Sequence, residues 1–163
     1  MAIRTILTEG DPALNKVCHP VTKFDDKLGD LLDDLKETLA KANGLGLAAP
    51  QVGILRRAVI VVDDNGEMLE LVNPEIIDQK GEQDGLEGCL SVPGKWGYVK
   101  RPQWVKVKAQ DREGNWFEVE GQDVTARCFC HELAHLDGHL YVELTDRLYT
   151  SEELDAMAQE DEA

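Results

Sequence analysis

Residues 131–135 read His-Glu-Leu-Ala-His, and this pattern restricts the fold and chemistry of the chain more than any other feature. On a helix, His131 and His135 would lie one turn apart on one face, where both imidazoles can bind one divalent metal ion. Glu132 lies beside them and can act as a base. A surface helix with two hydrogen-bonded histidines and a solvated glutamate is the alternative. We favour the metal site, because the chain has only 4 histidines and a chance match is therefore rare.

The residues around this motif favour a helix. Asp123 or Thr125 can cap its start, and Gly138 can end it. Leu133 and Leu136 supply apolar positions around the histidines. Two histidines do not complete a catalytic centre, because such centres have three protein ligands and leave one position for water.

The third ligand is expected upstream of the motif. An endopeptidase of the zincin class would supply it downstream, but the third histidine position of the extended motif holds Tyr141. On a helix that continued past Gly138, His139 would lie about 80° around the axis from His131, at about 100° per residue. His139 could therefore not bind the same ion without a rearranged turn. Upstream, Cys89 stands between a glycine and a Pro-Gly turn, which suits a thiolate at an exposed strand end. Cys128 is a rival, although a ligand from a separate element completes a tetrahedron more easily.

Three segments in order resemble the signature motifs of the peptide deformylases. Residues 44–51 read GLGLAAPQ, residues 87–91 read EGCLS and residues 131–135 read HELAH. The resemblance also includes Asp11-Pro12-x-Leu14 and Arg101, so it covers roughly residues 4 to 148. It implies a metal-dependent amide hydrolase that removes the N-terminal formyl group from formyl-methionyl nascent peptides and releases formate.

The resemblance also implies a role for individual residues. Cys89, His131 and His135 are the implied metal ligands. Glu132 is the implied acid/base, which takes a proton from the attacking water and passes it to the leaving amine. Gln51 and the backbone N–H of Leu90 are the implied groups that hold the substrate carbonyl oxygen, and Glu87 with Arg101 is the implied supporting ion pair. The implied border of the methionine pocket consists of Leu45, Gly46, Gly88, Phe129 and Cys130.

Ligand chemistry alone favours zinc for a Cys-His-His site, whereas the resemblance implies ferrous iron in cells, with zinc, nickel or cobalt able to substitute. We therefore expect one divalent ion, Fe²⁺ in vivo. The chain departs from the usual family pattern Q-H-E-x-D-H at two positions, Cys130 and Ala134. Neither is an implied ligand, so the departures concern helix anchoring and the tuning of the site more than its chemistry.

Composition agrees with a compact, soluble enzyme that is strongly acidic. Its 163 residues suit one domain, and 42% hydrophobic content is enough for a core. A charge of −15, from 17 basic and 32 acidic residues, argues against direct nucleic-acid binding. No apolar stretch of about 18 residues occurs, and the start has no apolar signal core, so we expect a cytoplasmic protein without a membrane segment. The 4 cysteines then fit a reducing compartment.

The hydrophobic pattern predicts an α+β fold: a single compact domain with short, mostly antiparallel strands packed around the motif helix. A helix is expected from about residue 25 to 42, with a leucine stripe facing the core. Strands are expected at 57–62, 68–72, 74–80, 104–110 and 116–120, with hairpin turns at 64–66 and 113–115. We divide the chain into a catalytic domain, residues 1–150, and an acidic C-terminal tail, residues 151–163.

The tail contains no Lys or Arg and is expected to be a solvated segment or a short helix. A deformylase meets its N-formylmethionyl substrates at the ribosome, and relatives that dock there are expected to use a basic C-terminal helix. This tail has the opposite charge, so any ribosome contact is expected to be transient or to use another surface. Two rival functions remain, a small zincin-like endopeptidase and a metal-binding module without catalysis.

Overall fold

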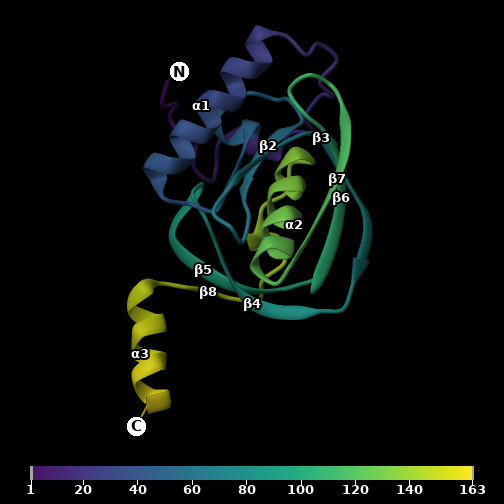
Figure 1. Cartoon of the computed structure of the whole chain (residues 1–163). Coiled ribbons are helices and arrows are strands. Elements are labelled where there is room, and N and C mark those ends of the chain that lie inside the picture. The colour runs from purple at the N-terminus through teal and green to yellow at the C-terminus, as the bar shows by residue number, and fades with distance from the viewer. Residues whose placement is uncertain (1, 163) are drawn as a thin grey trace.

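Two antiparallel sheets surround the motif helix in the computed structural model, which describes residues 2–162 (Figure 1). Met1 and Ala163, which belong to the predicted catalytic domain and tail, lie outside the described residues. The larger sheet has the strand order β1-β2-β3-β6-β7, with the bounds Gly46–Ala48, Ala58–Val62, Met68–Lys80, Trp104–Gln110 and Trp116–Gln122. The smaller sheet has the order β4-β5-β8, with the bounds Gln83–Cys89, Val92–Arg101 and Leu148–Tyr149. The predicted α+β class with mostly antiparallel strands is confirmed.

Helix α1 (Asp26–Ala42) covers one face of the larger sheet and confirms the helix predicted from about residue 25. Asp25 caps it, because its side chain accepts a hydrogen bond from the backbone N–H of Leu28 at 3.2 Å. Asn43 ends it in a left-handed conformation. The leucine stripe is buried against strand residues such as Ile60, as predicted; its members are Leu28, Leu31, Leu32, Leu35 and Leu39.

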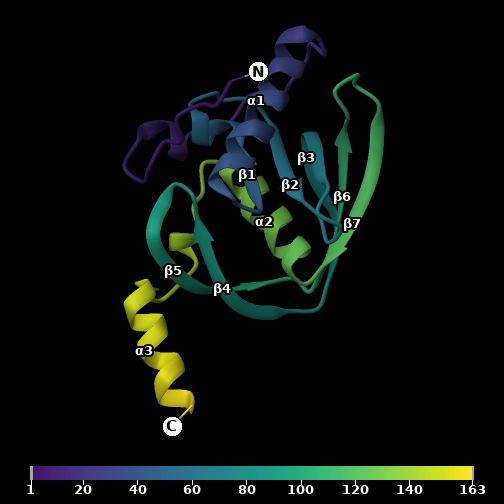
Figure 2. The same ribbon diagram turned by 60° about the vertical axis from the view of Figure 1, so that its left-hand side comes forward.

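Helix α2 (Val124–Leu136) is the motif helix and lies at the centre of the molecule (Figure 2). Phe129, Leu133 and Leu136 pack into the core with strand residues of the larger sheet. Asp123 holds the N-cap position, but its side chain makes no cap hydrogen bond. Thr125, the other predicted cap, lies inside the helix, where its hydroxyl donates to Asp64 at 2.8 Å.

Strand β3 differs from the prediction, because the expected strands 68–72 and 74–80 form one continuous strand. Asn73 has a left-handed φ of 49° inside it, and the register with β6 shifts next to this residue. Its side chain compensates by accepting from the N–H of Val21 at 2.8 Å and donating to Gln110 at 2.8 Å. The predicted turns at 64–66 and 113–115 do join antiparallel neighbours, β2 to β3 and β6 to β7.

Short 3-10 helices and a terminal helix complete the fold. The 3-10 segments within residues 2–162 are η1 (Pro12–Asn15), η2 (Ala49–Val52) and η3 (Tyr141–Glu143). The tail forms helix α3 (Ser151–Glu162), which projects away from both sheets (Figures 1 and 2). None of the helices described within residues 2–162 is both long and apolar enough to span a membrane.

Candidate metal centre and substrate cavity

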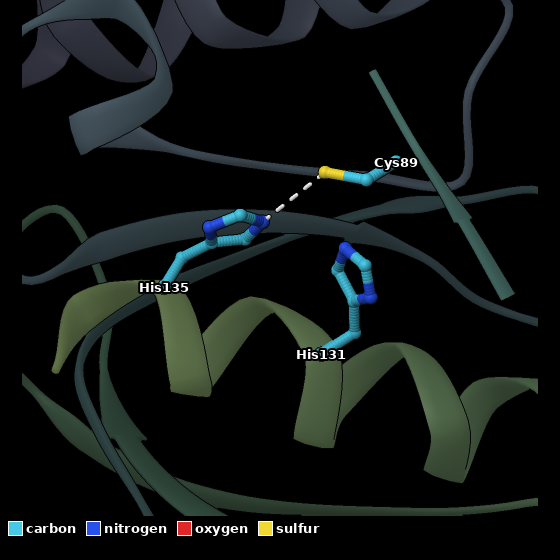
Figure 3. A group of neighbouring side chains, drawn as sticks. All are labelled: Cys89, His131 and His135. Atoms are coloured by element: carbon cyan, nitrogen blue, oxygen red, sulfur yellow. Dashed lines mark hydrogen bonds between the residues drawn. The ribbon is translucent and has the colours of Figure 1, made fainter. Parts of the chain in front are cut away.

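The end of strand β4 and one face of α2 bring a thiol and two imidazoles together. Cys89 Sγ lies 3.4 Å from His135 Nε2, and the ligand atoms of Cys89, His131 and His135 all lie within 4.8 Å of one another (Figure 3). This spacing fits one divalent ion, whose bonds to sulfur and nitrogen are about 2.0–2.3 Å long. Cys128, the rival ligand, is not a member of this group among the described residues.

Strand geometry explains the position of Cys89. Glu87 and Cys89 are two residues apart in β4, and although the register with β5 shifts between them, both side chains face α2, where they contact His131 and His135. Gly88 between them lies against the indole of Trp96 in β5, and a Cβ at Gly88 would be 2.8 Å from Cδ1 of that ring. The glycine therefore leaves room for the indole of Trp96 beside the site.

His131 is held by a buried carboxylate. Its Nδ1 lies 2.8 Å from Glu87 Oε1, so the imidazole can donate a hydrogen bond to Glu87 and present its other nitrogen to an ion. Glu87 also accepts hydrogen bonds from Arg101 at 2.7 and 2.9 Å and from Arg127 at 2.8 Å. Burial would raise the pKa of Glu87, but the hydrogen bonds from Arg101 and His131 outweigh it and lower the pKa to about 2.

The surroundings shift the pKa values of the two imidazoles in opposite directions. Burial lowers the pKa of His131, but the charge of Glu132, the nearby Cys89 and the hydrogen bond with Glu87 raise it to about 10. Burial lowers the pKa of His135 to about 3, and its Nδ1 has no hydrogen-bond partner among the described residues. The ring of Tyr141 stacks on His131 with the centroids 5.8 Å apart.

Glu132 is buried beside the two histidines, with 4% of its surface exposed. Its Oε1 has no hydrogen-bond partner among the described residues, and burial raises its pKa to about 7. Gly46 of β1 lies directly against it, since a Cβ there would be 2.8 Å from Glu132 Cδ. The carboxyl group is therefore positioned by the absence of a side chain at Gly46, and it can exchange a proton near neutral pH.

Gln51 in η2 presents its side-chain amide to the candidate metal centre, next to Cys89. Its Oε1 accepts from the N–H of Ala48 at 2.9 Å, which fixes the orientation of the side chain. Its Nε2 donates to Ser91 Oγ at 3.0 Å and lies 3.6 Å from Cys89 Sγ. Leu90 follows Cys89 in the turn between β4 and β5 and lines the adjacent cavity.

A cavity of about 790 Å³ opens beside the three candidate ligands. Leu45, Gly46 and Gly88, which the resemblance places at the methionine pocket, line this cavity. Other lining residues were not anticipated, namely Leu86, Trp96, Val124, Arg127 and Cys128.

Phe129 and Cys130 differ from the prediction, because they lie in the core beside the larger sheet. At about 100° per residue, positions 124, 127, 128 and 131 share the helix face that borders the cavity, whereas 129 and 130 are rotated away from it.

Arg127 and Tyr141 are site residues that sequence reasoning missed. Arg127 lies one turn before His131 on the same helix, and this i to i+4 spacing could have indicated a shared partner. Tyr141 comes from η3, and nothing in its local sequence indicates that it stacks on His131. Cys128 is buried, and this burial raises the pKa of its thiol to about 12.

Residues 3–151 match the model of a family described as polypeptide deformylase. The chain is 57% identical over 143 residues to a peptide deformylase from Agathobacter rectalis, covering 88% of this chain and 90% of the relative. It is 51% identical over 160 residues to one from Caldanaerobacter subterraneus, covering 98% and 99%. The crystal structure of peptide deformylase from Thermotoga maritima is similar with a TM-score of 0.85 and 37% identity, covering 89% and 99%.

Proposed function

The chain belongs to the peptide deformylase family, and from this premise we propose which of its residues carry out the reaction. The enzyme is a metallohydrolase that removes the N-terminal formyl group from nascent peptides. Cys89, His131 and His135 hold one divalent ion. The observation that carries this proposal is the meeting of their ligand atoms within 4.8 Å, beside a cavity large enough for a side chain.

Glu132 moves the proton in the proposed mechanism. When bound, the ion supplies Lewis acidity, which polarises a carbonyl group and makes a water molecule acidic near neutral pH. Glu132 accepts the proton that the attacking water loses and delivers it to the leaving amine. Its burial beside both imidazoles and its unpartnered Oε1 support this role. Glu132 is not needed as a ligand, because the three other donors already complete a set.

Gln51 and the backbone N–H of Leu90 hold the carbonyl oxygen of the substrate, on which negative charge develops. The Gln51 amide is already oriented by Ala48 and Ser91 before substrate arrives, so little reorganisation is needed. The loss of one donor of this kind typically costs about 2.7–4 kcal/mol in the activation free energy. We therefore expect Gln51→Ala to lower kcat by about 10²-fold or more without removing the ion.

The cavity receives the first side chain of the formylated peptide. Leu45, Gly46 and Gly88 border it, together with Val124 and Cys128 of α2. A hydrophobic pocket gains about 1–3 kcal/mol per substrate methylene. Peptides that begin with formyl-Met should therefore have a higher kcat/KM than those that begin with formyl-Ala, and equal values would contradict this use of the cavity.

We also propose that the ion is Fe²⁺ in cells, with Zn²⁺, Ni²⁺ or Co²⁺ able to replace it. A thiolate ligand beside Fe²⁺ is open to oxidation, so activity purified without oxygen should decay in air faster than activity of the Co²⁺-loaded protein. Because the substrates are nascent chains, the proposed location is the cytoplasm. Residues 1–150 form the catalytic part, and α3 makes no ribosome contact through phosphate, because its described charged side chains are acidic.

Three variants test the proposal. Cys89→Ala should lose both the ion and hydrolysis of a formyl-Met dipeptide, whereas Cys128→Ala, a matched change beside the same cavity, should keep the ion. Glu132→Gln should keep the ion and lower kcat by about 10²-fold or more. Metal loss in Cys128→Ala with retention in Cys89→Ala, or normal turnover in metal-loaded Glu132→Gln, would contradict these assignments. Cleavage of unformylated peptides would indicate an endopeptidase instead.

A further inference from the structure

Arg127 lies on the same helix as His131 and His135, and it contacts the carboxylate that holds His131. We propose that Arg127 is a positioning residue for His131 and acts through the carboxylate of Glu87. This inference rests on the proposed function, in which His131 is a metal ligand. It concerns a side chain that contacts neither ligand sulfur nor ligand nitrogen in the hydrogen bonds of the site.

A continuous buried path joins the three residues. Arg127 is 8% exposed, and one terminal nitrogen of its guanidinium donates to Glu87 Oε2 at 2.8 Å. The other oxygen of Glu87 lies 2.8 Å from His131 Nδ1. Glu87 is itself only 4% exposed, so water competes little for either contact. A displacement of the carboxylate would therefore reach the imidazole directly.

Arg127 is not equivalent to Arg101, although both contact the same carboxylate. Arg101 binds both oxygens of Glu87 from β5, so it ties the carboxylate to the neighbouring strand of the same sheet. Arg127 binds only Oε2 and comes from α2, one turn before His131. The same nitrogen also donates to the backbone oxygen of Val99 in β5 at 2.9 Å. Arg127 therefore fixes Glu87 relative to the helix that carries the ligand.

Arg127 also lines the cavity, so a test must separate positioning from substrate contact. Val124 offers the matched control, because it lines the same cavity one turn earlier on α2 and has an apolar side chain that cannot hydrogen bond to Glu87. Arg127→Met removes the guanidinium but keeps an unbranched chain. Val124→Met changes the cavity without touching the path to His131.

The experiment measures the dissociation constant of Co²⁺ by competition with a chelator, the absorption spectrum of the Co²⁺-loaded protein, and kcat and KM for a formyl-Met peptide. Arg127→Met should weaken Co²⁺ binding by about 10- to 100-fold, shift the spectrum and lower kcat. Arg127→Lys, which keeps a positive donor, should recover part of the affinity. Val124→Met should change KM and leave the Co²⁺ affinity unchanged.

A double-mutant cycle shows whether the effect passes through Glu87. In a Glu87→Gln background, Arg127→Met should cost little further Co²⁺ affinity, because the carboxylate that transmits the effect is already gone. Unchanged Co²⁺ affinity in Arg127→Met, or the same loss with and without Glu87, would overturn the inference. If Arg127→Met does not fold, Arg127→Gln is judged by the same criteria. Failure of the wild type to bind Co²⁺ or to deformylate would overturn the proposed function instead.

Discussion

Substituting alanine for Gly46 should displace the carboxyl group of Glu132 while leaving the fold intact. Gly46 is not among the glycines with positive φ, so its backbone conformation accepts an alanine without strain. The obstacle is the side chain of Glu132, because a Cβ at position 46 would lie 2.8 Å from both Cγ and Cδ of that residue. The substitution therefore perturbs one side chain that is proposed to transfer protons.

The size of the displacement follows from ordinary contact distances. Carbon atoms in contact prefer separations of about 3.5–4.0 Å, so Glu132 must retreat by roughly 0.7–1.2 Å. Glu132 is 4% exposed but borders the cavity, into which it can move, so we expect overpacking to cost about 1 kcal/mol of stability, the low end of the usual range. A catalytic group that is misplaced by about 1 Å can lose about 10²-fold in rate. We expect kcat to fall by this amount.

Steady-state hydrolysis of a formyl-Met peptide, measured with metal content and thermal unfolding on the same samples, provides the assay. Gly46→Ala should retain the ion, because the candidate ligands come from β4 and α2 and not from β1. Metal-loaded Gly46→Ala with wild-type kcat would refute the argument that the glycine positions Glu132. Loss of the ion would instead mean that the perturbation spreads beyond the carboxyl group.

Three further outcomes are expected. Gly29→Ala in α1 should raise the free energy of unfolding by about 1 kcal/mol, because alanine favours a helix and the new Cβ meets only Arg112, at 3.7 Å. The midpoint of thermal unfolding should rise by about 2–4 °C, and a lower midpoint would contradict the prediction. Truncation after Thr150 keeps β8 and removes α3, so deformylation and ribosome co-sedimentation should both be unchanged, and a fall in either would show that α3 has a role. Tyr141→Phe keeps the ring that stacks on His131 and should bind Co²⁺ normally, whereas Tyr141→Leu should bind it more weakly; equal affinities would show that the stack does not position the ligand.

The elements with strong local patterns were the ones that the sequence could predict. The leucine spacing of α1, the motif of α2 and the turns at 64–66 and 113–115 each depend on residues close together in the chain. The meeting of Cys89 with two histidines followed from ligand chemistry and the family resemblance. The local patterns need no knowledge of distant contacts, whereas Cys89 and His135 are 46 residues apart and were brought together only by ligand chemistry and the resemblance.

The remaining features depend on contacts that local sequence does not report. Strands β4 and β5 were not predicted, because glycines at 85, 88, 94 and 97 interrupt the alternation typical of strands. Asn73 continues β3 only because Val21 and Gln110 satisfy its side chain. The position of Arg127 depends on Glu87, which lies 40 residues away in the chain. The assignment of Phe129 to the cavity was a different error, since counting residues around the helix would have placed it in the core.

The candidate ligands lie on elements that differ in how well packing protects them from local unfolding. His131 and His135 belong to a helix whose opposite face is packed into the core of the larger sheet, whereas Cys89 lies at the end of β4, next to the turn of a hairpin in the smaller sheet. Local opening of a protein begins at segments with few buried apolar contacts. Opening of the hairpin must break the buried hydrogen bonds of Glu87 with Arg127 and His131, and it would separate the sulfur from the two imidazoles while the core stays folded. Activity would then be lost while most secondary structure remains. Hydrogen exchange at β4 and β5 would detect the opening of the hairpin while the rest of the molecule stays folded.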